Sequence, residues 1–111
     1  MNKSIFTTEP AHPRVAEWVR YLDEHPDQIR PVHFFFYANE EGDAYRLAHE
    51  LQNLDFRIVQ VMESQNRRWL CLAEMNLVPD PPVMDLCTDL LHKVARDHSV
   101  EYDGWETRID L

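Results

Sequence analysis

Apolar residues recur at helical spacing in two long segments, and this pattern predicts two amphipathic helices. The first set is Ala44, Leu47, Ala48 and Leu51, which predicts a helix over residues 39–53. Asn39 is its expected N-cap, and the acidic residues that follow suit the positive end of the helix dipole. The second set is Val83, Cys87, Leu90, Leu91, Val94 and His98. Asp80 and Pro81 precede it as the expected cap and first helical residue.

Four shorter segments are rich in β-branched and aromatic residues and predict strands. They are residues 32–38, 56–62, 69–75 and 105–110. The first holds three consecutive phenylalanines, a pattern typical of a strand that is covered on both faces. Residues 99–104 end in an Asp-Gly pair, which favours turns, so we expect a turn before the last strand.

A proline-punctuated leader, residues 1–31, precedes this αβ body, residues 32–111. Between Pro13 and Pro26, one helical stripe is formed by Val15, Trp18, Val19 and Leu22. The stripe predicts a short amphipathic helix, which starts near Pro13 and ends before Pro26. We therefore expect a leader with one helix followed by a single domain.

The order of the elements in the body is β-α-β-β-α-β, which predicts an α+β fold of the ferredoxin-like type. Right-handed crossovers place the first and third strands in the centre of a four-stranded antiparallel sheet. Both helices then cover one face of the sheet. The other face needs a cover, which we expect to be either the leader helix or a partner.

The net charge of the chain limits the classes of molecule that we expect it to bind. The chain of 111 residues carries 20 acidic and 11 basic residues, a formal charge of −9. This sign opposes binding to the phosphate backbone of nucleic acids and favours either solubility alone or a basic protein partner. The chain has no apolar run long enough to span a membrane, and its first residues lack the apolar core of a signal peptide. We expect a cytoplasmic protein that contacts neither nucleic acid nor membrane.

Nothing in the sequence indicates a reaction centre. The six histidines show no metal-binding spacing, and only two glycines are present, too few for a phosphate-binding loop. Cys71 and Cys87 form no CxxC motif and are expected to be buried thiols without a disulfide. The aromatic residues of the strands resemble an RNA-stacking platform, but the necessary cations are sparse, so core packing is favoured. We therefore expect no enzyme activity, no metal and no cofactor.

Two groups of residues are candidates for contact with a partner. Asp85, Asp89 and Asp97, with Lys93, follow one another at i+4 on the second helix. They form either a solvated face with an Asp89–Lys93 pair or an acidic contact strip.

The second group is Asp103, Trp105 and Thr107. Their segment is expected to be a turn that fixes the last strand, with Trp105 as its buried anchor. The alternative is a recognition corner that presents Trp105 and Thr107 to a partner.

Several short segments of the chain resemble the ribonuclease E regulator B (RraB) family, and the resemblance covers roughly residues 32–109. They are the segments HFFFY at residues 33–37, WLCLA at residues 69–73 and YDGWET at residues 102–107. The resemblance implies a noncatalytic protein that binds the arginine-rich scaffold region of a bacterial RNA-degrading endonuclease and changes which RNAs are degraded. The acidic charge of this chain agrees with such a partner.

Other hypotheses stay open beside this one. The chain could be a protein-binding module with another target, in an antitoxin-like or immunity-like role. It could also be a small-ligand or enzyme module, which an apolar cavity with converging polar groups would favour. The sequence leaves the oligomeric state open.

Overall fold

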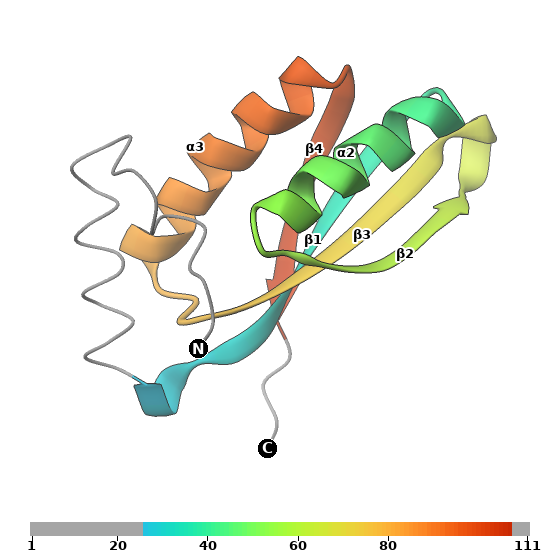
Figure 1. The fold of residues 1–111 in the computed structure, drawn as a ribbon. Coiled ribbons are helices and arrows are strands. Elements are labelled where there is room, and N and C mark those ends of the chain that lie inside the picture. Colours follow the sequence, from blue (N-terminus) through green and yellow to red (C-terminus); the bar gives the residue numbers. More distant parts are fainter. Residues whose placement is uncertain (1–25, 108–111) are drawn as a thin grey trace.

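The fold is an antiparallel sheet with two helices on one face (Figure 1). The structure is a computed structural model, which describes residues 26–107. Its strands and α-helices are β1 (Arg30–Ala38), α2 (Glu41–Asn53), β2 (Arg57–Glu63), β3 (Trp69–Leu77), α3 (Pro81–Asp97) and β4 (Val100–Thr107). Two 3-10 turns, η1 (Pro26–Gln28) and η2 (Gln65–Arg67), complete them.

The strand order is β2-β3-β1-β4, and every neighbouring pair is antiparallel. The first and third strands are therefore central, which confirms the ferredoxin-like α+β prediction. The predicted leader helix, with Trp18 on its stripe, lies outside the described residues.

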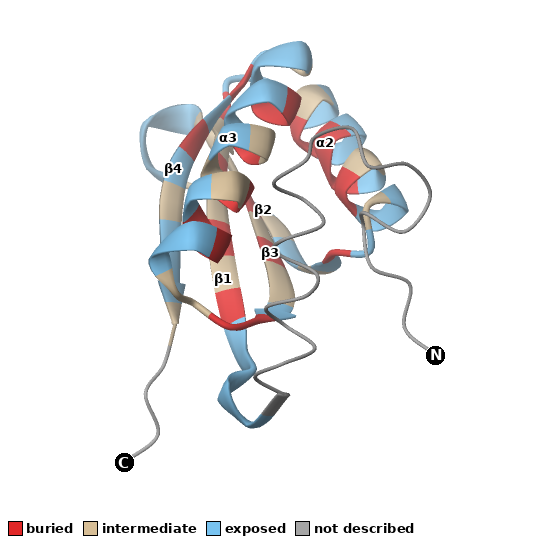
Figure 2. Ribbon diagram, turned by 90° about the vertical axis from the view of Figure 1, so that its left-hand side faces the viewer, coloured by how far each residue is buried: buried red, intermediate tan, exposed pale blue. Residues whose placement is uncertain are grey.

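The side chains of β1 alternate between the two faces of the sheet. Phe34 and Phe36 are 0% exposed and face the helices, whereas Phe35 and Tyr37 between them are only partly buried. The side of β1 that faces the helices is therefore fully buried, whereas the other side is only partly covered. Figure 2 shows the buried residues concentrated where the helices and the sheet face one another. One face of the sheet holds the core, and the other remains partly accessible.

Both helices bury the predicted apolar stripes. In α2 the buried residues are Ala44, Leu47, Ala48 and Leu51, and in α3 they include Val83, Cys87, Leu91 and Val94. The N-cap of α2 is Glu40 rather than the expected Asn39, while Asp80 and Pro81 occupy the expected positions at the start of α3. His98 is the C-cap of α3 and only partly buried, because the helix ends at Asp97.

The last strand starts earlier than expected. β4 begins at Val100, so residues 99–104 do not form the predicted turn. Val100 and Tyr102 alternate into the core, and this burial extends the strand toward α3. Phe35 pairs with Gly104 and Phe36 with Tyr102, which leaves Asp103 as an extra residue in a β-bulge. Gly104 has a φ of +112°, so it supplies a conformation within the strand instead of within a turn.

Candidate functional site

Trp105 lies on an exposed strand edge. It is 38% exposed, so the prediction of a buried anchor is wrong. Its partner across the sheet is Phe34, which is fully buried. β4 is an edge strand with only β1 beside it, and in this sheet no further strand flanks the outer side of Trp105. Trp105 pairs with a residue that faces the helices, yet its own side chain is left partly uncovered near the end of β4.

Carboxylates also lie along β4 near Trp105, although Glu106, which pairs with His33, points to the opposite face of the sheet. Glu101, Asp103 and Glu106 are all exposed. Asp103 occupies the bulge, and Glu106 pairs with His33 of β1. The part of β4 from Asp103 onward thus combines an exposed aromatic side chain with negative charge. We call Asp103, Trp105 and Glu106 the β4 edge site.

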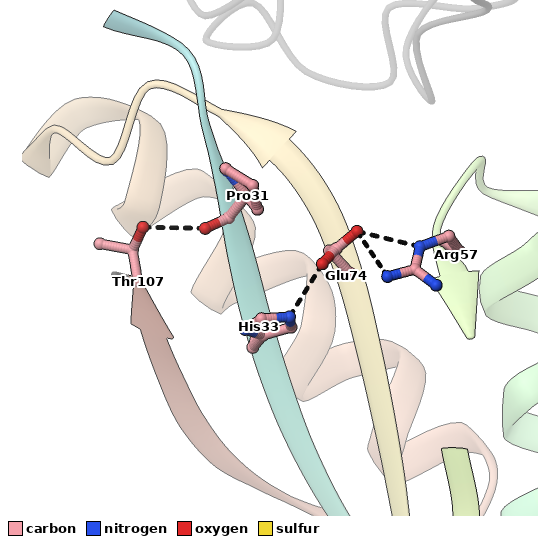
Figure 3. Close-up of polar contacts among 5 residues, drawn as sticks. All are labelled: Pro31, His33, Arg57, Glu74 and Thr107. Atoms are coloured by element: carbon pink, nitrogen blue, oxygen red, sulfur yellow. Dashed lines mark hydrogen bonds and ion pairs between the residues drawn. The ribbon is translucent and has the colours of Figure 1, made fainter. Parts of the chain in front are cut away.

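Thr107 has a role within the fold. Its hydroxyl donates a hydrogen bond of 2.8 Å to the backbone carbonyl of Pro31 (Figure 3). This bond joins the end of β4 to the beginning of β1. Thr107 therefore borders the β4 edge site, but its hydroxyl is already engaged.

The three aspartates of α3 are exposed on the side of the helix away from its buried stripe. Asp85 and Asp97 are twelve positions apart, with Asp89 between them, so the three aspartates extend along roughly 18 Å of helix. Lys93 is exposed between them, yet across the described part of the chain no ion pair joins it to Asp89. Since α3 packs against the sheet with its opposite side, these aspartates point away from the sheet.

The accessible face of the sheet carries a polar network that the sequence pattern did not reveal. Glu74 of β3 accepts hydrogen bonds of 2.8 Å from His33 on β1 and 2.9 Å from Arg57 on β2 (Figure 3). Partial burial by itself raises the pKa of the Glu74 carboxyl, but the hydrogen bonds and charges of Arg57 and His33 outweigh it and lower that pKa. These partners come from three strands, so only the strand register brings them together.

The described residues contain no metal-binding cluster, and both cysteines are buried. Within residues 26–107, no group of three or more His, Cys, Asp or Glu side chains could hold a metal ion. Cys71 and Cys87 are buried and free, as predicted, and burial raises the pKa of both thiols to about 12. They stay protonated at neutral pH, which makes them poor nucleophiles. No helix in this part of the chain is long and apolar enough to cross a membrane.

Comparison with known proteins supplies the family. The family model described as "Regulator of ribonuclease activity B" matches residues 23–107. This range includes every described strand and helix, together with Asp85, Asp89, Asp97 and the β4 edge site. A search of curated proteins gives no significant match. The match covers most of the chain and includes the segments at residues 33–37, 69–73 and 102–107 that resemble this family. The chain therefore belongs to the RraB family, regulators of ribonuclease activity.

Proposed function

We propose that this protein is a noncatalytic regulator that binds a basic segment of an RNA-processing endonuclease through its β4 edge site. The observation that carries the proposal is the exposure of Trp105, which lies on an edge strand with carboxylates near it in the strand. The chain also belongs to a family of ribonuclease regulators. The endonuclease that the resemblance indicates is ribonuclease E, through its arginine-rich scaffold region.

The chemistry of the β4 edge site suits an arginine-rich segment. A tryptophan ring attracts a guanidinium group over its face, and tryptophan is among the residues that dominate binding energies at protein interfaces. Asp103 and Glu106 offer carboxylates on either side of Trp105. An edge strand also offers unpaired backbone groups to an extended peptide. One short basic segment would meet all three features.

The aspartates of α3 would act at longer range. Asp85, Asp89 and Asp97 point away from the sheet on α3, and we assign them a role apart from the contact at Trp105. Exposed carboxylates such as these attract a basic partner and mainly raise the rate of association. The formal charge of −9 supports a basic protein partner over direct contact with RNA.

Binding to the scaffold segment of the endonuclease, measured by titration calorimetry with Trp105→Ala, tests the proposal. We expect a loss of about 2 kcal/mol in binding free energy, roughly thirty-fold in affinity. Tyr45→Ala is the matched control, because Tyr45 is 53% exposed and lies on α2, away from β4. Circular dichroism at the same temperature verifies that both variants are folded. Equal affinities for wild type and folded Trp105→Ala would contradict the β4 edge site.

The regulatory role requires a second measurement. Adding the wild-type protein to the full-length endonuclease should change the cleavage rates of its RNA substrates, and Trp105→Ala should change them less at equal concentration. Cleavage of RNA by the regulator alone would contradict its noncatalytic role. A folded regulator that binds the endonuclease and leaves every cleavage rate unchanged would argue against regulation.

A further inference from the structure

A cavity of about 700 Å³ lies at the end of the sheet where β1 ends and β4 begins, beside the last turns of α3. Its polar lining includes Asn39, Arg68, His92, Arg96, Ser99 and Glu101. Its less polar walls are Tyr37, Ala95, Val100 and Tyr102. None of the candidate partner-binding residues lines it. The volume is in the range of small-molecule sites, which typically combine apolar walls with a few converging polar groups.

The charge of this cavity is opposite to that of the chain. The protein has 20 acidic and 11 basic residues, yet the lining holds two arginines and a histidine against a single carboxylate, Glu101. Arg96 is exposed and forms no ion pair with any residue of the described range. A locally positive cavity in a strongly acidic protein would concentrate small anions.

Arg68 is held in place and still has an unused donor. Its Nη2 donates a hydrogen bond of 2.8 Å to Glu101 and a long one of 3.4 Å to the backbone carbonyl of Tyr37. Its guanidinium lies over the Tyr37 ring, 5.1 Å from the centroid. Its Nε is buried and has no hydrogen-bond partner in the structure. A buried donor without an acceptor is unfavourable, whereas the Arg68 side chain as a whole is 32% exposed and open to a ligand.

Aromatic side chains form one wall of the cavity. The ring of His92 meets the ring of Tyr102 edge to face, with centroids 5.0 Å apart. The Tyr102 hydroxyl is buried near Thr88 without a hydrogen-bond partner of good geometry, and burial raises the pKa of Tyr102 to about 12. Tyr102 thus stays a neutral donor at physiological pH. This wall suits the planar part of a ligand whose charged part meets the arginines.

We propose that this cavity binds a small phosphate monoester of about nucleotide size, with the phosphate near Arg68 and Arg96 and the planar body against the wall formed by His92 and Tyr102. Guanidinium groups suit the phosphate because they donate paired hydrogen bonds to its oxygens. Glu101 opposes the ligand, since its carboxylate repels the phosphate and occupies one donor of Arg68. The site would give the regulator a metabolite-responsive input that is separate from the proposed contact with the endonuclease.

Titration calorimetry on the full chain, with adenosine monophosphate as the probe, tests this site. Adenosine and inorganic phosphate are the comparison ligands. We expect adenosine monophosphate to bind more tightly than either, because it alone reaches both the arginines and the aromatic wall. Failure of adenosine monophosphate to bind at millimolar concentration would overturn the proposal. The measurement requires no endonuclease, so it stands or fails independently of the proposed function.

Charge variants locate the site. We expect Arg96→Gln to weaken binding by about ten-fold, as loss of a charge-assisted contact does. Arg68→Gln should weaken it at least as much, whereas Glu101→Gln should strengthen it. Arg57→Gln is the control, because it removes the same charge from an exposed arginine on β2, outside the cavity. Equal weakening by Arg57→Gln and Arg96→Gln would show nonspecific attraction and overturn the site.

A 5′-phosphorylated oligoribonucleotide separates a free metabolite from the end of an RNA chain. It presents the same phosphate monoester, but its other phosphates meet a protein of net charge −9. We therefore expect it to bind more weakly than adenosine monophosphate. Tighter binding of the oligonucleotide would overturn the assignment to a free small molecule.

Discussion

The two halves of β4, on either side of the bulge at Asp103, differ in what surrounds them. In the first half Val100 and Tyr102 are each 8% exposed and pack against β1 and α3. In the second half Trp105 is 38% exposed between two exposed carboxylates. Val100 and Tyr102, which precede the bulge, therefore pack in the core, whereas Trp105 after the bulge is accessible. The comparison teaches that an aromatic residue in a strand has a structural or a recognition role according to what covers it.

The largest effect is expected from Tyr102→Ala, in the buried half. The Tyr102 ring packs against Phe36 at 5.2 Å and His92 at 5.0 Å between centroids. Removing it should lower the free energy of unfolding by about 3–5 kcal/mol. Urea unfolding measures the change, with Tyr45→Ala on the surface of α2 as the control. Similar losses in the two variants would mean that the first half of β4 is not part of the core.

Trp105→Ala should have a smaller effect on stability and a larger one on binding. Because Trp105 is partly exposed, we expect a loss of about 1–2 kcal/mol in the free energy of unfolding. That is less than for Tyr102→Ala, although tryptophan is the larger side chain. The same urea unfolding experiment measures it. A loss equal to or above that of Tyr102→Ala would remove the distinction between the two halves.

Gly104→Ala tests the bulge that separates the halves. A side chain at a φ of +112° is strained even though a Cβ there meets no atom within 4 Å, so we expect a loss of about 1–2 kcal/mol. Gly42→Ala in α2 is an informative control. Its added Cβ meets only the flexible end of Arg46, and alanine is the better helix former, by roughly 0.5–1 kcal/mol. Thermal unfolding should therefore shift in opposite directions for the two alanine variants.

Replacing single carboxylates should change partner binding only slightly. Asp103→Asn beside Trp105 should cost about 0.2–1 kcal/mol, and Asp89→Asn on α3 no more than that, mainly through slower association. Surface plasmon resonance at low and high salt measures both rates. If reversing the charge of Asp85, Asp89 and Asp97 together leaves the association rate unchanged, the aspartates of α3 have no part in binding.

Acid should weaken the network next to the second half of β4. The pKa of Glu74 is lower in the folded protein than its ordinary value, so Glu74 stabilises the fold above its unfolded pKa. This contribution is lost as the pH falls through the lowered folded pKa. Glu74→Gln should therefore reduce the difference in stability between neutral and acid pH, measured by urea unfolding. An unchanged pH dependence would show that Arg57 and His33 do not stabilise the Glu74 carboxylate.

Periodicity located the helices because each packs one continuous stripe against a sheet. The stripes of α2 and α3 are local patterns, so residues such as Leu47 and Cys87 were predicted to be buried without knowledge of the fold. The start of β4 was missed for the opposite reason. The Asp-Gly pair favours a turn locally, but burial of Val100 and Tyr102 extends the strand, and a bulge absorbs the extra residue.

The candidate site was predicted in part. Asp103, Trp105 and the aspartates of α3 were identified as possible contacts, and all are exposed. The exposure of Trp105 was not predictable, because the sequence placed the last strand at the edge of the sheet but did not show which of its side chains the helices would cover. The hydrogen bond from Thr107 to Pro31 joins residues 76 positions apart. The positive cavity likewise brings together Arg68, which directly precedes β3, and Arg96 of α3.

The sequence by itself determined the order of elements, the sides of the helices that are buried, the acidic character and the family. The elements and their buried sides follow from spacings of a few residues, the acidic character follows from composition, and the family follows from short sequence segments. Tertiary structure decided which side chains of β4 are covered, where β4 bends, and which charges meet across the sheet. The physical reason is that exposure and electrostatic pairing depend on neighbours that are distant in sequence, and strand register alone sets those neighbours.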